Sequence, residues 1–278
     1  MAYAGIRHRR LGSKLAELRK RAALKQTEVT EQLGWNQATL ARYERGERVP
    51  KRAIMSELFA LYDVSANERE EVMTLYRLAE RPSWWYPYRD LLQPEYAALI
   101  DLEADAAEIR TFEILVPGLF QTPDYARHIL QYGPQEISTE EVERRLELRM
   151  ARQEILDQAD RPRLLTIMDE GALGRAVGGR AVMHAQIDHL LQLSRQARTS
   201  IQVVPYTAGA HPGASGSFTL IDCAGTRVVY VDTMAGQLYL ERSPEVTTCS
   251  HAFEQLLGFA LNPNDSADLM RQYLKEYT

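Results

Sequence analysis

Apolar residues recur at helical spacing through the first eighty residues of the chain, in short stretches that glycine, proline and polar residues separate. The first stretch follows Ser13, a residue type that caps helices, and places Leu15, Leu18 and Ala22 on one side of a helix. Later stretches repeat this spacing and end at turn residues, which predicts further helices over residues 26–33, 37–45, 53–62 and 67–80. We therefore expect an all-α N-terminal domain.

Residues beyond 90 alternate between helical spacing and short runs rich in β-branched residues. The β-branched runs predict strands over residues 109–116, 163–168, 200–205, 217–222, 227–231 and 237–241. The helical stretches lie at residues 94–107, 123–131, 139–158, 181–196, 244–261 and 265–275. Turn residues separate the last three strands, which favours an antiparallel meander, whereas the long helix at 181–196 allows a parallel crossover. The pattern predicts a C-terminal α/β or α+β domain with a mixed sheet.

The two patterns are separated by residues 81–88, RPSWWYPY, which contain two prolines and four aromatic residues. Such a composition interrupts regular structure, so we expect a linker or docking strip at this point. Aromatic clusters of this kind more often pack under a neighbouring domain than bind a ligand, and we favour packing.

Charge is distributed unevenly along the chain. Residues 1–52 contain 13 Lys and Arg and 5 acidic residues, a balance of +8, whereas the remaining 226 residues contain 20 basic and 33 acidic residues, a balance of −13. The formal net charge of −5 therefore conceals a strongly basic N-terminal segment. Such asymmetry suggests that the basic end contacts a nucleic acid, although a solvated basic face without a partner is the plainer alternative.

The segment 26–44, QTEVTEQLGWNQATLARYE, joins two of the predicted helices through a tight turn. Gly34 suits the left-handed position that ends the first helix, and Asn36 suits the cap of the second. In a helix-turn-helix, one helix braces the DNA backbone and the next presents polar side chains to base edges. Because the positive charge lies in the same part of the chain, we favour this interpretation over an ordinary helical hairpin.

The predicted recognition helix places Gln37 on its first turn, where an amide can pair with adenine N6 and N7. Ala38 and Thr39 can contact a thymine methyl group, and Arg42, one turn further, can reach guanine or a phosphate. The basic run at residues 7–10 either forms an arm that contacts the minor groove or the DNA backbone, or belongs to a frayed N-terminus. The full set of predicted DNA-contacting residues also includes the cap, the start of the brace helix and flanking basic residues, and comprises Gln26, Asn36, Gln37, Ala38, Thr39, Arg42, Arg45, Arg48 and Lys51.

The sequence contains no catalytic motif as clear as the helix-turn-helix pattern. It has no H-E-x-x-H, G-x-S-x-G or phosphate-loop motif. His184 and His189 lie about 140° apart around a predicted helix, so they do not face a common metal ion. His211, in the glycine-rich run 209–216, either grips a ligand or belongs to a flexible connection, and we favour the connection. Asp169 either meets a ligand at a strand's carboxyl end or caps the next helix, and we favour the cap. We expect no catalytic residue, no metal site and no cofactor.

Membrane and secretory classes are not favoured by the sequence. No apolar run approaches the roughly eighteen residues of a membrane span, and the N-terminal residues lack the apolar core of a secretory signal. The two cysteines, Cys223 and Cys249, are far apart and lack metal-ligand spacing, which argues against a disulfide framework. We expect a cytoplasmic protein without membrane contact.

The segment 26–44 resembles the Cro/cI-type helix-turn-helix of the xenobiotic-response-element class of bacterial regulators, and the resemblance covers about residues 11–63. Two positions depart from the usual pattern. Lys25 stands where a Ser or Thr commonly caps the brace helix, and Thr30 stands where a small Ala usually lets the two helices approach. Neither departure removes a DNA-facing group.

The rest of the chain resembles the uncharacterised C-terminal domain of many actinobacterial regulators of this class, over about residues 103–261. The resemblance is carried by the stretches VPGLFQTPDYAR at 116–127, RQEIL at 152–156, DEGAL at 169–173, QVVP at 202–205 and GAHPG at 209–213. Members of this family are often encoded beside a small partner protein, and some are described as antitoxin-like. The resemblance therefore implies control of transcription.

We interpret the chain as a sequence-specific DNA-binding transcriptional regulator with a helix-turn-helix domain at 1–80, a linker and docking segment at 81–108 and a regulatory α/β domain at 109–278. One such DNA-binding domain reads few base pairs, so we expect a homodimer on double-stranded DNA, with the C-terminal domain as the dimer surface. In the hypothesis that we favour, the C-terminal domain also docks a small protein encoded nearby. The alternatives are that it senses a small molecule through Asp169 and His211 or, less favoured, that it is an enzyme.

Overall fold

The computed structural model describes residues 6–80, 84–133, 136–223 and 226–278. The chain divides into two compact units, Met1–Asp101 and Leu102–Thr278. The division falls within the segment 81–108 that was predicted as a linker; residues 81–83 of that segment lie outside the described part of the chain. Residues 1–5, which belong to the N-terminal stretch expected to lack a signal, also lie outside it.

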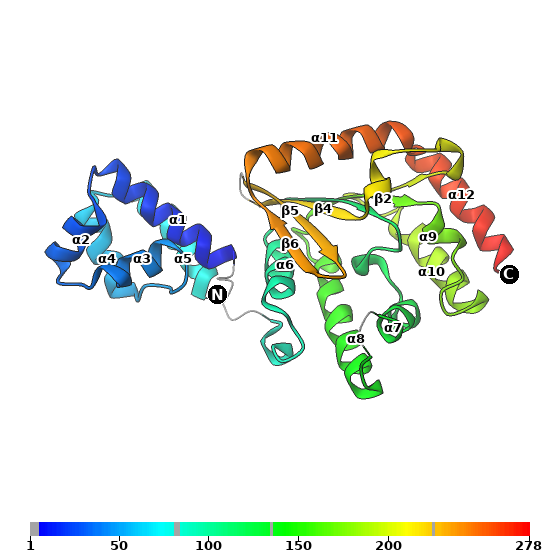
Figure 1. The fold of residues 1–278 in the computed structure, drawn as a ribbon, viewed down its shortest axis with the longest axis horizontal. Coiled ribbons are helices and arrows are strands. Elements are labelled where there is room, and N and C mark those ends of the chain that lie inside the picture. The colour runs from blue at the N-terminus through cyan, green and yellow to red at the C-terminus, as the bar shows by residue number, and fades with distance from the viewer. Residues whose placement is uncertain (1–5, 81–83, 134–135, 224–225) are drawn as a thin grey trace. The chain divides into compact units, whose positions relative to one another are not determined.

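The N-terminal unit begins with five helices (Figure 1), namely α1 (Ile6–Arg21), α2 (Gln26–Leu33), α3 (Gln37–Glu44), α4 (Arg52–Leu61) and α5 (Ala66–Glu80). The prediction that Ser13 caps the first helix is wrong, because α1 begins at Ile6. Leu11 is 1% exposed and extends the apolar stripe of Leu15 and Leu18 toward the N-terminus, so the helix continues through Ser13. The basic run at residues 7–10 is therefore part of α1 and forms no separate arm.

A single apolar core unites these five helices. It contains Leu15 and Leu18 from α1, Leu40 from α3, Leu58 from α4 and Val72 from α5, all fully buried. The glycine at position 12 allows α1 to approach α3 closely, since a Cβ there would lie 2.5 Å from the carbonyl oxygen of Tyr43. The core thus holds α3 by its inner side and leaves its outer side to solvent.

The turn between α2 and α3 confirms the local signals of the sequence. Gly34 ends α2 with a φ of 66°, the left-handed conformation that glycine adopts without strain. Asn36 caps α3, and its Oδ1 accepts a hydrogen bond of 2.9 Å from the main-chain N–H of Ala38. The entry angle of α3 is therefore set by two neighbouring residues with defined backbone roles.

The C-terminal unit is built on one mixed sheet of six strands in the order β3-β2-β1-β4-β5-β6. β1, β2 and β3 are parallel, whereas β4, β5 and β6 form the antiparallel meander predicted from the sequence. The strands are β1 (Glu108–Glu113), β2 (Arg163–Asp169), β3 (Thr199–Val204), β4 (Phe218–Cys223), β5 (Thr226–Thr233) and β6 (Gly236–Leu240). β1 ends at Glu113, three residues earlier than the predicted strand 109–116. The reason is that the main-chain N–H of Ile114 donates to the Ser217 hydroxyl instead of extending the hydrogen-bond ladder.

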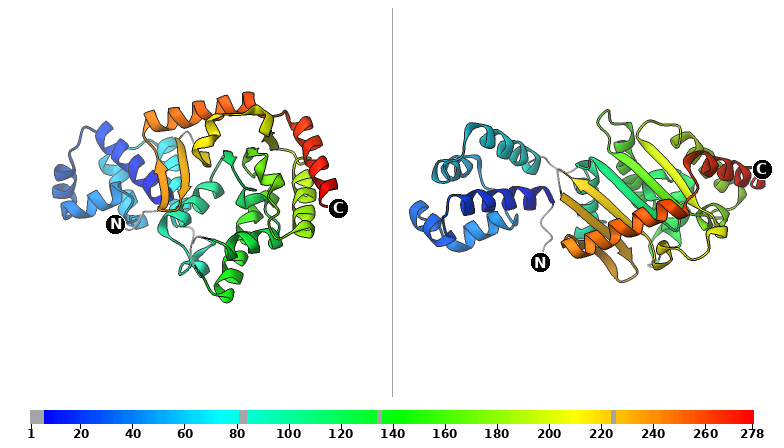
Figure 2. Two further views of the ribbon diagram at one scale, coloured as in Figure 1. Left: turned by 45° about the vertical axis from the view of Figure 1, so that its right-hand side comes forward. Right: turned by 90° about the horizontal axis from the view of Figure 1, so that it is seen from above.

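Helices cover both faces of this sheet. Figure 1 shows α11 (Ser243–Phe259) on one side and α7, α8 and α10 on the other, and Figure 2 shows α11 running across the strands. α10 connects β2 to β3, so the predicted parallel crossover is confirmed. The remaining helical bounds are α6 (Pro94–Ala104), which spans the division between the units, α7 (Pro123–Gln131), α8 (Thr139–Gln153), α9 (Gly171–Gly174), α10 (Arg180–Leu193) and α12 (Pro263–Glu276).

The two faces of the sheet differ in chemistry. Under α11 the core is apolar and contains Phe112, Ile167 and Leu220 from the strands together with Phe253 and Leu256 from the helix. This continuous apolar face explains why α11 packs on this side of the sheet, because burial of such side chains is the main stabilising contribution to a core.

On the opposite face a row of buried threonines crosses the centre of the sheet. Thr111 pairs in register with Thr166 of β2 and Thr219 of β4, and its hydroxyl lies 3.0 Å from the Thr219 hydroxyl. The same hydroxyl donates to Glu113 Oε1 over 2.9 Å. Burial raises the pKa of Glu113 to about 7, despite the nearby positive charge of Arg152. This side of the sheet therefore contains a carboxyl group that is partly protonated near neutral pH.

Candidate nucleic-acid interface

The outer side of α3 carries the residues that sequence reasoning assigned to base contacts. Leu40 and Tyr43 are buried, and the Tyr43 ring meets the Trp35 ring edge-on with centroids 6.0 Å apart. Gln37, Ala38 and Arg42 are exposed, whereas Thr39 is half-buried. The core thus fixes the inner side of the helix while three of the four predicted base-contacting side chains face solvent.

A buried ion pair ties α3 to the helix that crosses it. Arg19 of α1 donates from Nε and Nη2 to the two carboxylate oxygens of Glu44, over 2.6 and 2.9 Å. The same guanidinium donates from Nη1 to the carbonyl of Leu24, just before α2. Hydrogen bonding to Glu44 raises the pKa of Arg19 above its ordinary value. The pair therefore anchors the C-terminal end of α3 and the start of α2 to α1.

Gln26 joins this ion pair, so its side chain has less freedom than the sequence implied. Its Nε2 donates to Glu44 Oε2 over 2.7 Å, which leaves the second N–H of the amide for a DNA phosphate. The Glu28 carboxylate accepts the main-chain N–H of Lys25 over 2.7 Å, which is the bond that the third helical residue supplies in a capping box, whereas the Lys25 side chain makes no cap hydrogen bond. Gln26 consequently lies at the start of α2, as a phosphate contact requires, with its orientation set by Glu44.

Exposed basic residues flank α3 on the chain that follows it. Arg45, Arg48 and Lys51 are all exposed. Arg45 is engaged by Glu47, with Nε to Oε1 and Nη2 to Oε2 distances of 2.7 and 3.2 Å. The hydrogen bonds from Arg45 lower the pKa of Glu47 below its ordinary value. A phosphate that binds Arg45 must compete with this carboxylate, whereas no ion pair within the described part of the chain restrains Arg48 or Lys51.

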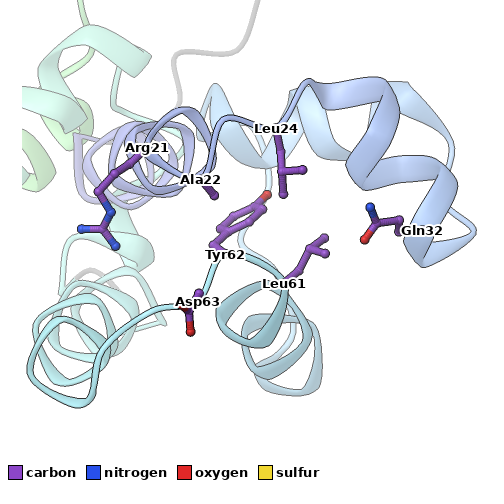
Figure 3. A pocket seen from close by; sticks show the side chains of 7 residues that line it. All are labelled: Arg21, Ala22, Leu24, Gln32, Leu61, Tyr62 and Asp63. Atoms are coloured by element: carbon purple, nitrogen blue, oxygen red, sulfur yellow. The ribbon is translucent and has the colours of Figure 1, made fainter.

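A surface hollow of about 540 Å³ lies elsewhere in the same unit (Figure 3). The buried Tyr62 hydroxyl has no hydrogen-bond partner among the described residues, and burial raises its pKa. None of the predicted DNA-contacting residues is among the seven that line the hollow, which are Arg21, Ala22, Leu24, Gln32, Leu61, Tyr62 and Asp63. The hollow is therefore separate from the outer side of α3.

Sequence reasoning missed Arg19 and Glu44 as determinants of this interface. Arg19 lies four residues after Leu15, so it continues the apolar stripe of α1 toward the core. A charged residue at a predicted core position indicates a buried partner of opposite charge. Which acid supplies that partner depends on the tertiary packing of α1 against α3 and could not be read from spacing.

The two candidate ligand-binding residues of the C-terminal unit lie close together. His211 Nε2 is 3.6 Å from Asp169 Oδ2, and the His211 side chain is 10% exposed. Asp169 Oδ1 also accepts the main-chain N–H of Gly171 over 2.8 Å, which restrains the start of α9, although the cap residue of that helix is Glu170 and not Asp169. The glycine-rich run packs onto the sheet, because a Cβ on Gly213 would lie 2.2 Å from the Phe112 ring. The ring of Phe112 also contacts His211 edge-on at 5.7 Å.

The described part of the chain contains no cluster of three His, Cys, Asp or Glu side chains arranged to hold a metal ion. None of its helices is long and apolar enough to cross a membrane.

Comparisons with known families agree with this two-part organisation. Residues 10–72 match a helix-turn-helix domain family, and residues 96–272 match a family described as a domain of unknown function (DUF5753). No curated protein matches the chain, and no solved structure matches it. The N-terminal match identifies a DNA-binding regulator of the helix-turn-helix type. Because the second match covers more than half of the sequence, the chain belongs to the DUF5753 family and carries a helix-turn-helix domain in front of that family's domain.

Proposed function

We propose that this protein is a sequence-specific, cytoplasmic transcriptional regulator of the Cro/cI-type class that binds operator DNA as a homodimer. α3 enters the major groove and reads bases with Gln37, Ala38, Thr39 and Arg42, while Gln26, Arg45, Arg48 and Lys51 contact the backbone. The resemblance of its C-terminal part to that of antitoxin-like actinobacterial regulators supports this assignment. We propose regulation rather than catalysis as its role.

The observation that carries the proposal is the combination of a firmly held inner side of α3 with an exposed polar outer side. Asn36 caps the helix, Glu44 anchors its far end to Arg19, and Gln37 and Arg42 remain exposed between these two restraints. Base readout requires side chains that approach the groove in a fixed register, since each bidentate contact depends on donor and acceptor positions. A rigid helix with a solvated polar side meets this requirement.

Replacing Gln37 with alanine tests the readout. We expect Gln37→Ala to reduce discrimination at one operator position by about 1–3 kcal/mol, because the amide pair with adenine is lost. Lys51→Ala is the matched comparison, since loss of a phosphate contact weakens binding to all sequences by a similar factor and makes binding less salt-dependent. The measurement is selection of preferred sites from random duplexes, followed by affinity measurements at several salt concentrations. Uniform weakening by both variants would show that Gln37 reads no base.

Docking of a small partner protein is the second function that an observation favours. Trp84 and Tyr86 are 40% and 58% exposed, so the strip predicted to pack under a neighbouring domain presents two large rings to solvent. Trp85 donates from Nε1 to Asp101 over 3.0 Å, and the Arg89 guanidinium lies 4.4 Å from the Tyr86 ring centroid. Exposed aromatic residues with restrained orientation are common at protein interfaces. The contact between Asp169 and His211 is the corresponding support for small-molecule sensing.

A double variant tests docking at this strip. We expect Trp84→Ala combined with Tyr86→Ala to abolish co-purification with the protein encoded next to this one, because the exposed rings supply the contact area. Tyr132→Ala is the control, since Tyr132 is 79% exposed in another segment. Unchanged co-purification of the double variant would contradict docking at this strip.

A further inference from the structure

Within the residues that the structure describes, no further strand pairs with the β6 edge of the sheet. β6 is the last strand in the order of the described sheet, and its sequence, GQLYL, contains neither a charged residue nor a proline. Charges and prolines are the residues that commonly protect sheet edges from pairing with another chain. Leu238 at the centre of β6 is 53% exposed, and Met234 in the preceding turn is 93% exposed. β6 is therefore an apolar strand without the usual protection.

The opposite edge, at β3, is closed by the protein itself. The Val203 carbonyl accepts a hydrogen bond of 2.9 Å from the main-chain N–H of Leu261, and the Val203 N–H donates to the Ser266 hydroxyl over 3.0 Å. The Gln202 side chain adds a bond of 2.8 Å to the Leu261 carbonyl. The turn between α11 and α12, together with the first turn of α12, thus occupies the outer side of β3 at Val203. A second strand can be added at β6 without displacing such a cover.

The register of the hairpin determines which groups of β6 face outward. Thr233 and Gly236 are paired across a two-residue turn, and such a closing pair exchanges both main-chain hydrogen bonds. Because hydrogen-bonded and non-hydrogen-bonded pairs alternate, the main-chain N–H and C=O of Gln237 point away from β5. Leu238 pairs with Val231, which packs against the apolar core under α11. The Leu238 side chain therefore lies at the exposed margin of that core.

We propose that β6 is the dimerisation strand, to which a second copy of this chain adds its own β6 in antiparallel orientation about a two-fold axis through Leu238. This inference rests on the proposed function, which requires two copies on one operator. In this arrangement Gln237 of each copy exchanges main-chain hydrogen bonds with the other strand. Leu238 stands directly opposite Leu238 of the second copy, with Cα atoms about 4.5 Å apart, and the two side chains join the cores under both copies of α11.

The composition of β6 favours an identical strand as the occupant. A two-fold axis places a residue that lies on it directly against its own copy, so a charge at that position would repel itself. The five residues of β6 carry none, and the residue on the axis is apolar. A contact of this length buries less than the roughly 1,600 Å² of a standard interface. We therefore expect the dimer to dissociate on dilution and to be reinforced by binding two adjacent DNA half-sites.

Charge-reversal variants of the full-length protein test this arrangement. We expect Leu238→Glu and Leu238→Lys each to halve the mass measured by sedimentation, because like charges then meet on the axis. An equimolar mixture of the two variants recovers the dimer mass, since Glu faces Lys across the axis, and this rescue excludes misfolding as the cause. Leu257→Glu on α11 is the matched control, because Leu257 is also an exposed leucine, at 37%, and its substitution leaves the dimer intact.

The outcomes separate this proposal from the proposed function. A dimer that persists in Leu238→Glu, a mixture that stays monomeric, or a wild-type chain that is monomeric throughout a concentration series overturns the β6 dimer. None of these results changes the sequence preference of α3. Equal affinity of the wild-type protein for selected and random DNA overturns the proposed function, whatever the solution mass.

Discussion

Replacing Glu44 with alanine is expected to lower the free energy of unfolding of the N-terminal unit by about 3–5 kcal/mol and to abolish DNA binding. The substitution leaves the Arg19 guanidinium, whose side chain is 11% exposed, without its carboxylate partner. Gln26 loses the same acceptor, so both the end of α3 and the start of α2 lose an anchor. Urea unfolding and hydrogen exchange of the α3 amides both measure the effect on stability. Binding to duplex DNA measures the effect on function.

Two comparison variants make this result interpretable. Glu31→Ala removes an exposed acid from α2 and is expected to change stability little. Arg19→Met combined with Glu44→Leu replaces the pair by apolar side chains, which restores much of the stability because no charge remains buried without a partner. DNA binding stays impaired in the double variant if Gln26 depends on Glu44 for its orientation. Equal stability of Glu44→Ala and wild-type protein would show that the ion pair does not hold α3.

Glu113→Gln is expected to stabilise the C-terminal unit above pH 7 by up to about 3 kcal/mol. Burial raises the pKa of Glu113 to about 7 in the folded chain, well above the ordinary value of 4.5 that applies after unfolding. Between these two values the folded state binds more protons than the unfolded state, so stability falls as pH rises and then levels off. Glutamine keeps the oxygen that accepts the Thr111 hydroxyl and has no charge to bury.

Denaturant unfolding across pH 4–8 checks this prediction. The wild-type curve is expected to decline across the window from about 4.5 to 7, whereas the Glu113→Gln curve lacks that contribution. Glu147→Gln on α8 makes the same change of charge at an exposed position and serves as the control. Parallel pH dependence of wild-type and Glu113→Gln protein would contradict a raised pKa at this site.

The N-terminal fold was largely predictable because its determinants are local. Gly34 ends one helix and Asn36 begins the next through their own backbone preferences, and both features act within four residues of sequence. The prediction that a helix begins at Ser13 was wrong because the determinant of the true start is not local. The local capping preference of Ser13 is overridden by Leu11, whose burial against the other helices extends α1 past it.

In the C-terminal unit the sequence predicted a mixed sheet and the meander, which the structure confirms, but not the strand order. Order depends on which strands meet across long connections, and spacing within a strand says nothing about its neighbours. The approach of His211 to Asp169 has the same origin, because it follows from packing of the glycine-rich run on Phe112. The pKa of Glu113 could not be anticipated either, since it reflects enclosure by residues distant in the chain.

The closed edge at β3 also bears on how far this protein can assemble. A sheet with two open edges can add copies indefinitely and grow into a fibre. Here Leu261 and Ser266 occupy the hydrogen-bonding groups of Val203, so β6 is the edge of the described sheet that remains for another chain. In the proposed dimer, pairing at β6 consumes the open edge of both copies and growth stops at two. We infer that the α11–α12 turn, besides completing the fold, protects the protein from polymerisation through this sheet.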